Sequence, residues 1–502
     1  MVNPLRPLAW LVLTVILAAV AYIVAAFCLA VLTWDGAGYV FNSIQRGRPA
    51  IPNGRYSDYP FLAVISVCSL FINDARWLAR IYGLVLAVLP LGSLVLSFHF
   101  LSGPKLRELR IWSVLGILLS VLPGQIFLVA EAVPLVQVAW AVWAIVAGEI
   151  SGPCLLWLGV LNAFLFFLHP TAALVYAVTA GLFLARARIG TGQPAETSEN
   201  ERQRAATSEN ETECEKRQGV EMPRAIERMR PPLDRQHRDL ISVLARCRSI
   251  SALPHADQWL ALVFISLAAI RLWYALATAN SYERGEETFA QNYVAFRDAW
   301  PSVRMLPFVY FLGLSVLGGV TGLIPKRIMM WLAGLSLGVL VVDAVGWATN
   351  PEVWVSAFSF RRFALVGTLP LLAMGAFHWQ YENAMRTHEP QSNNSGLGFI
   401  MLGSAAAFLL VFATQAFSWR QELTRFQADL SRCNKPVATT DDLPWISRSP
   451  LNHWASTQLS CVVQGKRVKT LFALDAEGVE GDKILLFPGI WFRKTNRWFE
   501  FE

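Results

Sequence analysis

The stretch from Leu8 to Thr33 reads LAWLVLTVILAAVAYIVAAFCLAVLT and is apolar almost throughout. A bilayer core takes about 20 apolar residues in a helix, so this stretch predicts a membrane-spanning helix. Trp34-Asp35-Gly36-Ala37-Gly38-Tyr39 follows directly and places an acid between aromatic residues at the edge of the membrane. The polar segment continues to Pro60 and carries two carboxylates, three arginines and three tyrosines. Because connections between spans are ordinarily short, this first loop is typical of a functional segment.

The composition places the chain among multi-span helical membrane proteins. Of its 502 residues, 54% are hydrophobic and 16% are charged, whereas a soluble domain has about 25% charged residues. The formal net charge of +7 suits basic cytoplasmic loops and does not indicate a nucleic-acid partner. The seven cysteines show no zinc or haem spacing. The first span is longer than the apolar region of a signal peptide, and no small-residue cleavage site follows it, so we expect a retained anchor.

Apolar runs predict an all-α polytopic bundle with about eleven membrane-spanning helices. They lie at 8–33, 78–101, 111–129, 132–148, 154–168, 170–186, 258–279, 306–324, 327–347, 360–379 and 397–417. The Lys and Arg residues of the loops place the N-terminus inside, since basic residues favour the cytoplasmic side. The segments 34–77 and 280–305 and the C-terminal tail then lie outside. The short apolar stretch from Pro60 to Asn73 predicts a re-entrant or interfacial helix.

Changes of composition divide the chain into four parts. These are a transmembrane catalytic module at 1–186, a cytoplasmic linker at 187–257, a second transmembrane module at 258–417 and an extracytoplasmic C-terminal domain at 418–502. The linker is rich in Glu, Arg, Gln and Ser, and Thr-Ser-Glu-Asn-Glu occurs twice in it, at 197 and at 207. Such a sequence buries too little apolar surface to offset its ordering entropy, so we expect disorder there.

The C-terminal part predicts a small α+β domain. Its pattern indicates a helix from Ser418 to Cys433 and strands from Arg467 to Leu474 and from Lys483 to Phe487. Cys433 and Cys461 are its only cysteines. Because this domain is expected in an oxidising compartment, we predict that they form a disulfide, which would contribute about 3–4 kcal/mol.

Asp35 is the first candidate for chemistry. An ionised and desolvated carboxylate at this place can act as a general base toward a hydroxyl, a role worth about 10²–10⁴-fold in rate. The alternative is structural, because Thr33-Trp34-Asp35 before a predicted helix at 36–45 also fits a helix N-cap. The residues alone do not separate these two interpretations.

Further motifs follow in a recognisable order. The first span is followed by an Asp-x-x-x-Tyr pattern, a segment ending in Tyr-Pro, and a second span. Ser120-Val121-Leu122-Pro123 precedes Glu131, and Phe167-Leu168-His169-Pro170 forms a polar turn before proline. This order resembles the GT-C superfamily of integral-membrane glycosyltransferases, which take sugars from polyprenyl-phosphate donors. The resemblance covers roughly residues 8–188. It implies that Asp35 matches the acidic residue of the first outer loop that is catalytic in those enzymes.

The resemblance assigns roles to two more residues. Glu131 lies between two apolar helices, where a carboxylate is costly unless it faces a cavity or a partner. It is expected to bind substrate, and a position at the membrane interface would weaken that inference. His169 is expected to bind the donor phosphate or an acceptor hydroxyl, although a single histidine is often purely structural.

Arginines on the expected outer side indicate an anion. Arg55 lies in the first outer loop near Asp58, where it is expected either to bind substrate or to pair with an acid or a lipid phosphate. Arg361 and Arg362 start a predicted span and suit the donor phosphate, since the planar guanidinium fits phosphate oxygens. Ordinary headgroup binding is the alternative. Glu286 lies in the loop 280–305, which is expected either to border the active site or to be a solvated cap.

The sequence therefore predicts a glycosyltransferase in the inner membrane of a bacterium, with its active site on the extracytoplasmic face. The donor is a polyprenyl-phosphate sugar, and the acceptor is an extracytoplasmic glycan, lipid or protein. Membrane lipids are further partners. These residues require no cofactor, although they are compatible with a divalent metal. The alternative is a transporter or flippase for a lipid-linked substrate, and a non-catalytic assembly subunit is a third interpretation.

Overall fold

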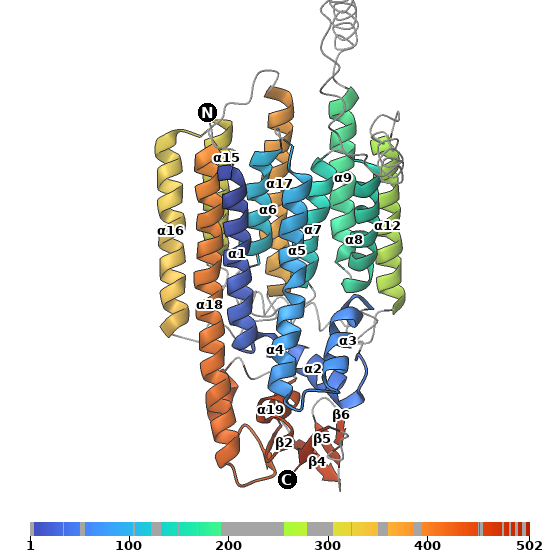
Figure 1. Cartoon of the computed structure of the whole chain (residues 1–502), viewed down its shortest axis with the longest axis vertical. Helices are drawn as coiled ribbons and strands as arrows, with labels where there is room; N and C mark the ends of the chain where they lie inside the picture. The colour runs from blue at the N-terminus through green and yellow to red at the C-terminus, as the bar shows by residue number, and fades with distance from the viewer. Residues whose placement is uncertain are drawn as a thin grey trace, which may run out of the picture. The chain divides into compact units, whose positions relative to one another are not determined.

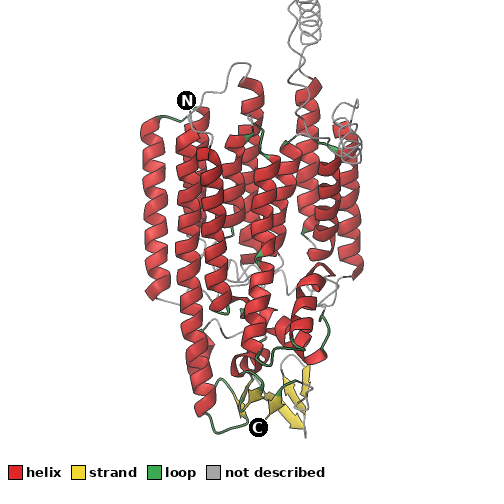
Figure 2. Ribbon diagram, in the orientation of Figure 1, coloured by secondary structure: helices red, strands yellow, loops and turns green. Residues whose placement is uncertain are grey.

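The computed structural model describes most of the chain outside its long loops. The described residues are 5–33, 35–50, 56–103, 106–121, 132–148, 150–169, 171–191, 256–278, 305–322, 324–349, 360–385, 394–449, 451, 455–473, 476–480, 483–486, 490–493 and 498–501. They are mainly helical, with short strands near the C-terminus (Figures 1 and 2).

Helices of very different length follow one another along the chain, from the 5 residues of Arg110–Val114 to the 39 residues of Asn394–Arg432. The α-helices are α1 (Leu5–Phe27), α2 (Asp35–Arg46), α3 (Tyr59–Cys68), α4 (Ala75–Leu86), α5 (Val88–Phe100), α6 (Arg110–Val114), α7 (Ala132–Ala147), α8 (Gly152–Leu168), α9 (Ala172–Thr191), α12 (Ala256–Thr278), α15 (Met305–Thr321), α16 (Lys326–Thr349), α17 (Phe360–Met385), α18 (Asn394–Arg432) and α19 (Ser456–Gln464). Short 3₁₀ turns are η1 (Ala30–Leu32), η2 (Tyr56–Asp58), η3 (Arg107–Leu109) and η11 (Pro444–Arg448), and η4 (Leu115–Leu119) is a π-helical turn.

The chain is a helical, membrane-associated protein. Four helical segments of the described chain are long and apolar enough to cross a bilayer, namely Ala9–Phe27, Ala75–Phe100, Ala256–Ala277 and Gly398–Arg432. Shorter apolar helices lie at five further predicted spans, among them α7, α8 and α9. The predicted short helices also form, since α2 covers the expected 36–45 and α3 lies within the apolar stretch after Asp58.

The described chain folds as two compact units. One consists of Met1–Gly148, Val160–Ala172 and Arg271–Glu502, and the other consists of Glu149–Gly159 and Ala173–Ile270. In the second unit, α9 and α12 are joined by an ion pair between Arg186 Nε and Asp257 Oδ2 at 3.2 Å. Phe264 packs there against Tyr176 and Phe183, with ring centroids 6.1 Å and 5.5 Å apart.

In the first unit, α1 lies along α18 (Figure 1). Small buried alanines on α1 let the helices approach closely, and Tyr22 packs against Phe408 and Phe412. Helix α18 continues unbroken past Phe417, so the predicted start of the C-terminal domain falls inside one helix. Trp419 on this extension donates a hydrogen bond from Nε1 to the carbonyl of Leu29 at 2.9 Å. The extension is thereby held against the turn that follows α1.

The strands build three small sheets. β1 (Val437–Ala438) pairs in parallel with β3 (Leu471–Phe472), and β2 (Arg467–Val468) pairs in parallel with β7 (Glu500–Phe501). β4 (Ala476–Glu480), β5 (Lys483–Leu486) and β6 (Ile490–Arg493) form an antiparallel sheet in that order. The predicted strand 467–474 is thus two short strands, and β5 matches the other predicted strand closely.

The C-terminal part packs directly onto the first loop of the chain. Helix α19 contacts α2, and the ring of Phe499 stacks on that of Phe41 with centroids 4.9 Å apart. Nearly the whole of α2 is buried as a result. The α2 segment therefore has a fixed place between the bundle and the C-terminal strands.

The predicted disulfide between Cys433 and Cys461 is not formed in the structure. Both are free thiols, and Cys461 is fully buried within α19. Burial raises the pKa of the Cys461 thiol well above its ordinary value. Because the thiolate is the form that exchanges with disulfides, this environment keeps Cys461 unreactive.

Thiol labelling tests this difference. In variants that retain only one cysteine, we expect a maleimide to label Cys433, which is half-buried, at least about 100-fold faster than Cys461. Unfolding the protein should make the two rates equal. Equal rates in the folded protein, or a mass shift of two hydrogens on reduction of the wild type, would contradict the structure.

Gly116 in η4 allows the closest approach in the helical core. A Cβ atom there would overlap the indole of Trp140 at Cε2, and that side chain is fully buried. We expect Gly116→Ala to destabilise the protein by about 1–3 kcal/mol or more, because Trp140 has no free volume into which it can move. Thermal unfolding in detergent measures the effect. Gly181→Ala is the matched control, since nothing lies within 4 Å of its new methyl group. The proposal of tight packing fails if both variants unfold at the same temperature.

Candidate functional site

The candidate site begins where α1 ends. Leu29 adopts a left-handed conformation with φ of 61°, which turns the chain sharply into η1. The Thr33 hydroxyl donates to the carbonyl of Ala30 at 2.7 Å, and α2 then starts at Asp35. Asp35 is 6% exposed, and Tyr39 lies one helical turn further and is also buried. The predicted Asp-x-x-x-Tyr pattern thus places both side chains along one stripe of a short, buried helix, whose N-terminus stabilises negative charge.

The end of the same loop joins α8. The Ser57 hydroxyl donates to the carbonyl of Phe164 at 2.5 Å, and the ring of Tyr56 meets Phe167 edge-on at 5.9 Å. Asp58 follows as the last residue of η2 and is 7% exposed. Although Asp58 occupies the N-cap position of α3, its carboxylate makes no capping hydrogen bond. The second carboxylate of the loop is therefore buried next to the C-terminal end of α8.

His169 lies directly after α8. Its Nδ1 is 2.7 Å from the Thr171 hydroxyl and also accepts a hydrogen bond from the Thr171 backbone N–H at 3.2 Å. The Ala172 N–H donates to the carbonyl of His169, which starts α9. Nδ1 is therefore the acceptor and Nε2 carries the ring proton. The imidazole is half-buried and organises the turn, which is the role that the structural alternative gives it.

Arg271 on α12 brings a cation to the same end of α8. Its side chain is 5% exposed, and its guanidinium lies 5.5 Å from the ring centre of Phe166 and 5.4 Å from that of Tyr274. Stacking on aromatic faces is a favourable setting for arginine. The sequence shows Arg271 only as a charge within a span, because the contact with α8 depends on the fold.

The remaining predicted residues are less fully placed. Arg55, Glu131 and Glu286 lie outside the described residues. Arg361 and Arg362 fall in the first turn of α17, where the backbone alone is described. Of the predicted site residues, the structure gathers Asp58 and His169 around the C-terminal end of α8, and α2 with Asp35 packs against α3.

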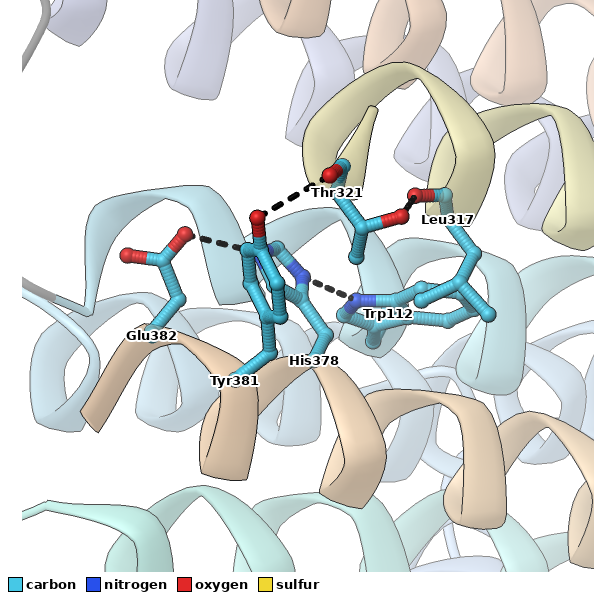
Figure 3. A network of polar contacts seen from close by, with 6 residues as sticks. All are labelled: Trp112, Leu317, Thr321, His378, Tyr381 and Glu382. Carbon is cyan, nitrogen blue, oxygen red and sulfur yellow. Dashed lines mark hydrogen bonds and ion pairs between the residues drawn. The ribbon is translucent and has the colours of Figure 1, made fainter. Parts of the chain in front are cut away.

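A second polar network lies elsewhere in the first unit, and sequence analysis missed it (Figure 3). Trp112 Nε1 donates to His378 Nδ1 at 2.9 Å, and His378 Nε2 lies 3.3 Å from Glu382 Oε1. All three side chains are buried. Nearby, the Tyr381 hydroxyl donates to the carbonyl of Thr321 at 3.0 Å. These contacts join α6, α15 and α17.

This network includes a group of possible metal ligands. One ligand atom each from Glu108, His378 and Glu382 lies within 4.8 Å of the others. Trp112 can only donate through Nε1, so the proton of the neutral imidazole must be on Nε2, where it faces Glu382. A metal at Nε2 would displace that proton to Nδ1 and break the buried bond to Trp112. The geometry therefore fits a proton shared between His378 and Glu382 better than a metal ion.

The sequence contains one signal for this network. His378 and Glu382 are four residues apart near the end of an apolar segment, which places them on one helix face. Trp112 carries no such signal, because it is one of 19 tryptophans and lies 266 residues away from His378.

The first loop carries two buried carboxylates, Asp35 and Asp58, and the C-terminal end of α8 adds the His169 imidazole and the buried Arg271 guanidinium. Such groups can accept a proton from a hydroxyl and stabilise an anion. Comparison with models of protein families, with curated proteins and with solved structures finds no match, so the function is inferred from the chain's own residues.

Proposed function

We propose that the protein is a membrane glycosyltransferase of GT-C type with about eleven membrane-spanning helices. Its N-terminus is cytoplasmic, and its site lies on the extracytoplasmic face of a bacterial inner membrane. The observation that carries the proposal is Asp35, a buried carboxylate in the first turn of α2, directly after the first candidate span. Ionisable groups buried at membrane level are costly and are commonly functional.

The reaction is a displacement at the anomeric carbon of a lipid-linked sugar. The acceptor hydroxyl attacks this carbon and forms a new glycosidic bond, while the bond from the carbon to the phosphate oxygen breaks. Asp35 takes the hydroxyl proton, and polyprenyl phosphate leaves with the bonding electron pair. Because phosphate is already a stable anion, it needs charge stabilisation more than protonation.

Cations on the same side stabilise the leaving phosphate in this proposal. Arg361 or Arg362 holds the phosphate, and the resemblance to GT-C enzymes supports that role. Arg271 supports it further, because it supplies a buried guanidinium beside the C-terminal end of α8. His169 binds the donor phosphate or an acceptor hydroxyl in this proposal. Asp58, Arg55, Glu131 and Glu286 complete the substrate-binding residues.

A panel of donors tests the proposal. The purified full-length protein in lipid vesicles is incubated with radiolabelled polyprenyl-phosphate sugars, with and without candidate glycan, lipid and peptide acceptors. Release of labelled sugar to an acceptor or to water, without any energy source, is the expected result. If a well-folded preparation consumes no donor, the proposed reaction is wrong.

Transport of a lipid-linked substrate is the second candidate, and the network around His378 favours it. His378 and Glu382 are buried in a helical bundle, where a shared proton is a common device of coupled transport. The two buried carboxylates on α2 and η2 favour the first candidate, because both lie between the first two candidate spans instead of within a span. Movement of an intact labelled lipid across vesicles, with no sugar released, would identify the transporter.

A further inference from the structure

Two arginines from different helices lie at the end of the first span, because the guanidinium of Arg80 stacks over Phe27 and Arg420 follows Trp419, which hydrogen-bonds to Leu29. Arg80 lies on α4 and Arg420 lies on the extension of α18, and both act electrostatically on the Cys28 thiol that follows α1. The two guanidinium groups also repel each other directly. Like charges are brought together here by the packing of α1 against both helices, which is shown in Figure 1.

The acid nearest to this pair is already engaged. Asp74 caps α4 by accepting from the Arg76 backbone N–H at 2.9 Å, and it also receives Arg76 Nε and Nη2 at 3.0 Å and 2.8 Å. Burial would raise the pKa of Asp74, but the hydrogen bonds from Arg76 outweigh it and hold that pKa below its ordinary value. The Asp74 carboxylate thus forms a bidentate ion pair with Arg76. It does not neutralise the positive charges of Arg80 and Arg420.

Neither remaining arginine is neutralised by the described part of the chain. No carboxylate there lies within 4.0 Å of the guanidinium of Arg80 or Arg420, and neither group is hydrogen-bonded to another described residue. Nε of Arg80 is buried without an acceptor. An uncompensated donor of this kind is costly. The positive charges of the two half-buried guanidinium groups also lack a counterion in the described part of the chain, and an external anion would supply one.

Aromatic residues hold Arg80 in place and also face outward. The guanidinium of Arg80 lies 4.4 Å from the ring centre of Trp77 and 5.9 Å from that of Phe27. Trp77 and Phe27 are themselves 47% and 48% exposed, and Phe417, one turn before Arg420, is 56% exposed. The arginines therefore adjoin an outward-facing apolar surface.

This surface lies where two candidate spans begin or end. The first candidate span ends at Phe27, and the second begins at Ala75. Arg80 is about 8 Å along its helix from that start, within reach of the headgroup region for a side chain of its length. Tryptophan beside arginine at this depth is typical of the interface.

We propose that Arg80 and Arg420 bind the phosphate of an anionic membrane lipid, whose acyl chains lie against Phe27, Trp77 and Phe417. The site supplies what such a lipid carries, since excess positive charge adjoins exposed apolar side chains on helices long enough to span a bilayer. Two planar guanidinium groups from separate helices can each bind phosphate oxygens. The inference does not depend on glycosyl transfer, because the lipid carries no sugar.

Lipid binding to the full-length protein in detergent tests the proposal. A fluorescent phosphatidylglycerol is titrated into the wild type and into Arg80→Gln and Arg420→Gln, with a fluorescent phosphatidylcholine as the zwitterionic probe, in which choline already neutralises the phosphate. We expect each substitution to weaken phosphatidylglycerol binding about fivefold, corresponding to about 1 kcal/mol per arginine near an anionic surface. The double variant should lose about 25-fold. Phosphatidylcholine binding should be weaker and unchanged by either substitution.

Arg432→Gln is the matched control, because it removes the same charge from the same helix α18 at a position that is 80% exposed. It should bind as the wild type does. Arg420→Gln keeps the test valid if Arg80→Gln fails to fold, since the guanidinium of Arg420 makes no hydrogen bond to a described residue. Unchanged affinity in folded Arg420→Gln, or an equal loss in Arg432→Gln, would overturn the proposal. So would displacement of the lipid by inorganic phosphate at equal concentration, because the anion alone would then account for binding.

Discussion

Replacing Asp35 with asparagine is expected to abolish sugar transfer while the protein folds normally. If Asp35 is the general base, its loss removes about 10²–10⁴-fold of the rate, since an amide cannot accept the acceptor proton. Asparagine has nearly the same volume as aspartate, so the substitution creates no cavity at the buried start of α2. The measurement is turnover of a polyprenyl-phosphate sugar, with thermal unfolding as the check on folding.

This substitution also separates the two interpretations of Asp35. Asparagine caps a helix about as well as aspartate does, whereas alanine costs about 0.5–2 kcal/mol at an N-cap. A purely structural Asp35 would therefore tolerate asparagine and lose stability with alanine. Full activity in Asp35→Asn would remove the catalytic role. Asp74→Asn is the matched control, because Asp74 caps α4 and has no part in the proposed reaction.

Asp58→Asn tests whether the effect of Asp35→Asn on sugar transfer is specific to Asp35. Asp58→Asn removes the other buried carboxylate of the same loop, and we place it in substrate binding. A rise in KM with little change in kcat is the signature of that role, whereas a general base mainly affects kcat. Comparing the two variants in one preparation distinguishes the proton acceptor from a binding residue.

Local patterns in the sequence predict much of the fold. The apolar run ending at Thr33 predicts α1, and the polar and aromatic positions that follow predict α2. These elements depend on residues near each other in the chain, so their periodicity is visible without the structure. The unbroken course of α18 past Phe417 was not predicted, because the change from apolar to polar residues suggested an end that the helix does not have.

Contacts between segments that are distant in the chain could not be predicted from the sequence. Asp35, Asp58 and His169 were chosen from their places in loops, but only the fold shows that Ser57 bonds to the carbonyl of Phe164. The expected disulfide is absent for a similar reason, since compartment and count predict it, whereas pairing depends on where the fold places the two thiols, and both are free in the structure.

His378→Leu is expected to cause the largest loss of stability among single substitutions in the described polar networks. The change leaves the Trp112 N–H and the Glu382 carboxylate, both buried, without the bonds that His378 gives them. Removing one member of a buried polar pair costs about 3–5 kcal/mol when a charge remains. Thermal unfolding in detergent should show a midpoint lower by several degrees, and a midpoint equal to that of the wild type would contradict the role of the network.

Compensating substitutions identify the origin of that loss. Trp112→Phe and Glu382→Gln remove the donor and the charge that His378 satisfies, so adding them to His378→Leu should restore part of the stability. The coupling arises because each group is costly only while its partner is missing. Strict additivity of the three substitutions would show that packing alone accounts for the effect.

Chelators should not change the unfolding of the wild type, since the bond from Trp112 keeps the imidazole proton on Nε2, where a metal would otherwise bind. A chelator-sensitive midpoint that His378→Leu abolishes would show instead that Glu108, His378 and Glu382 hold a metal ion.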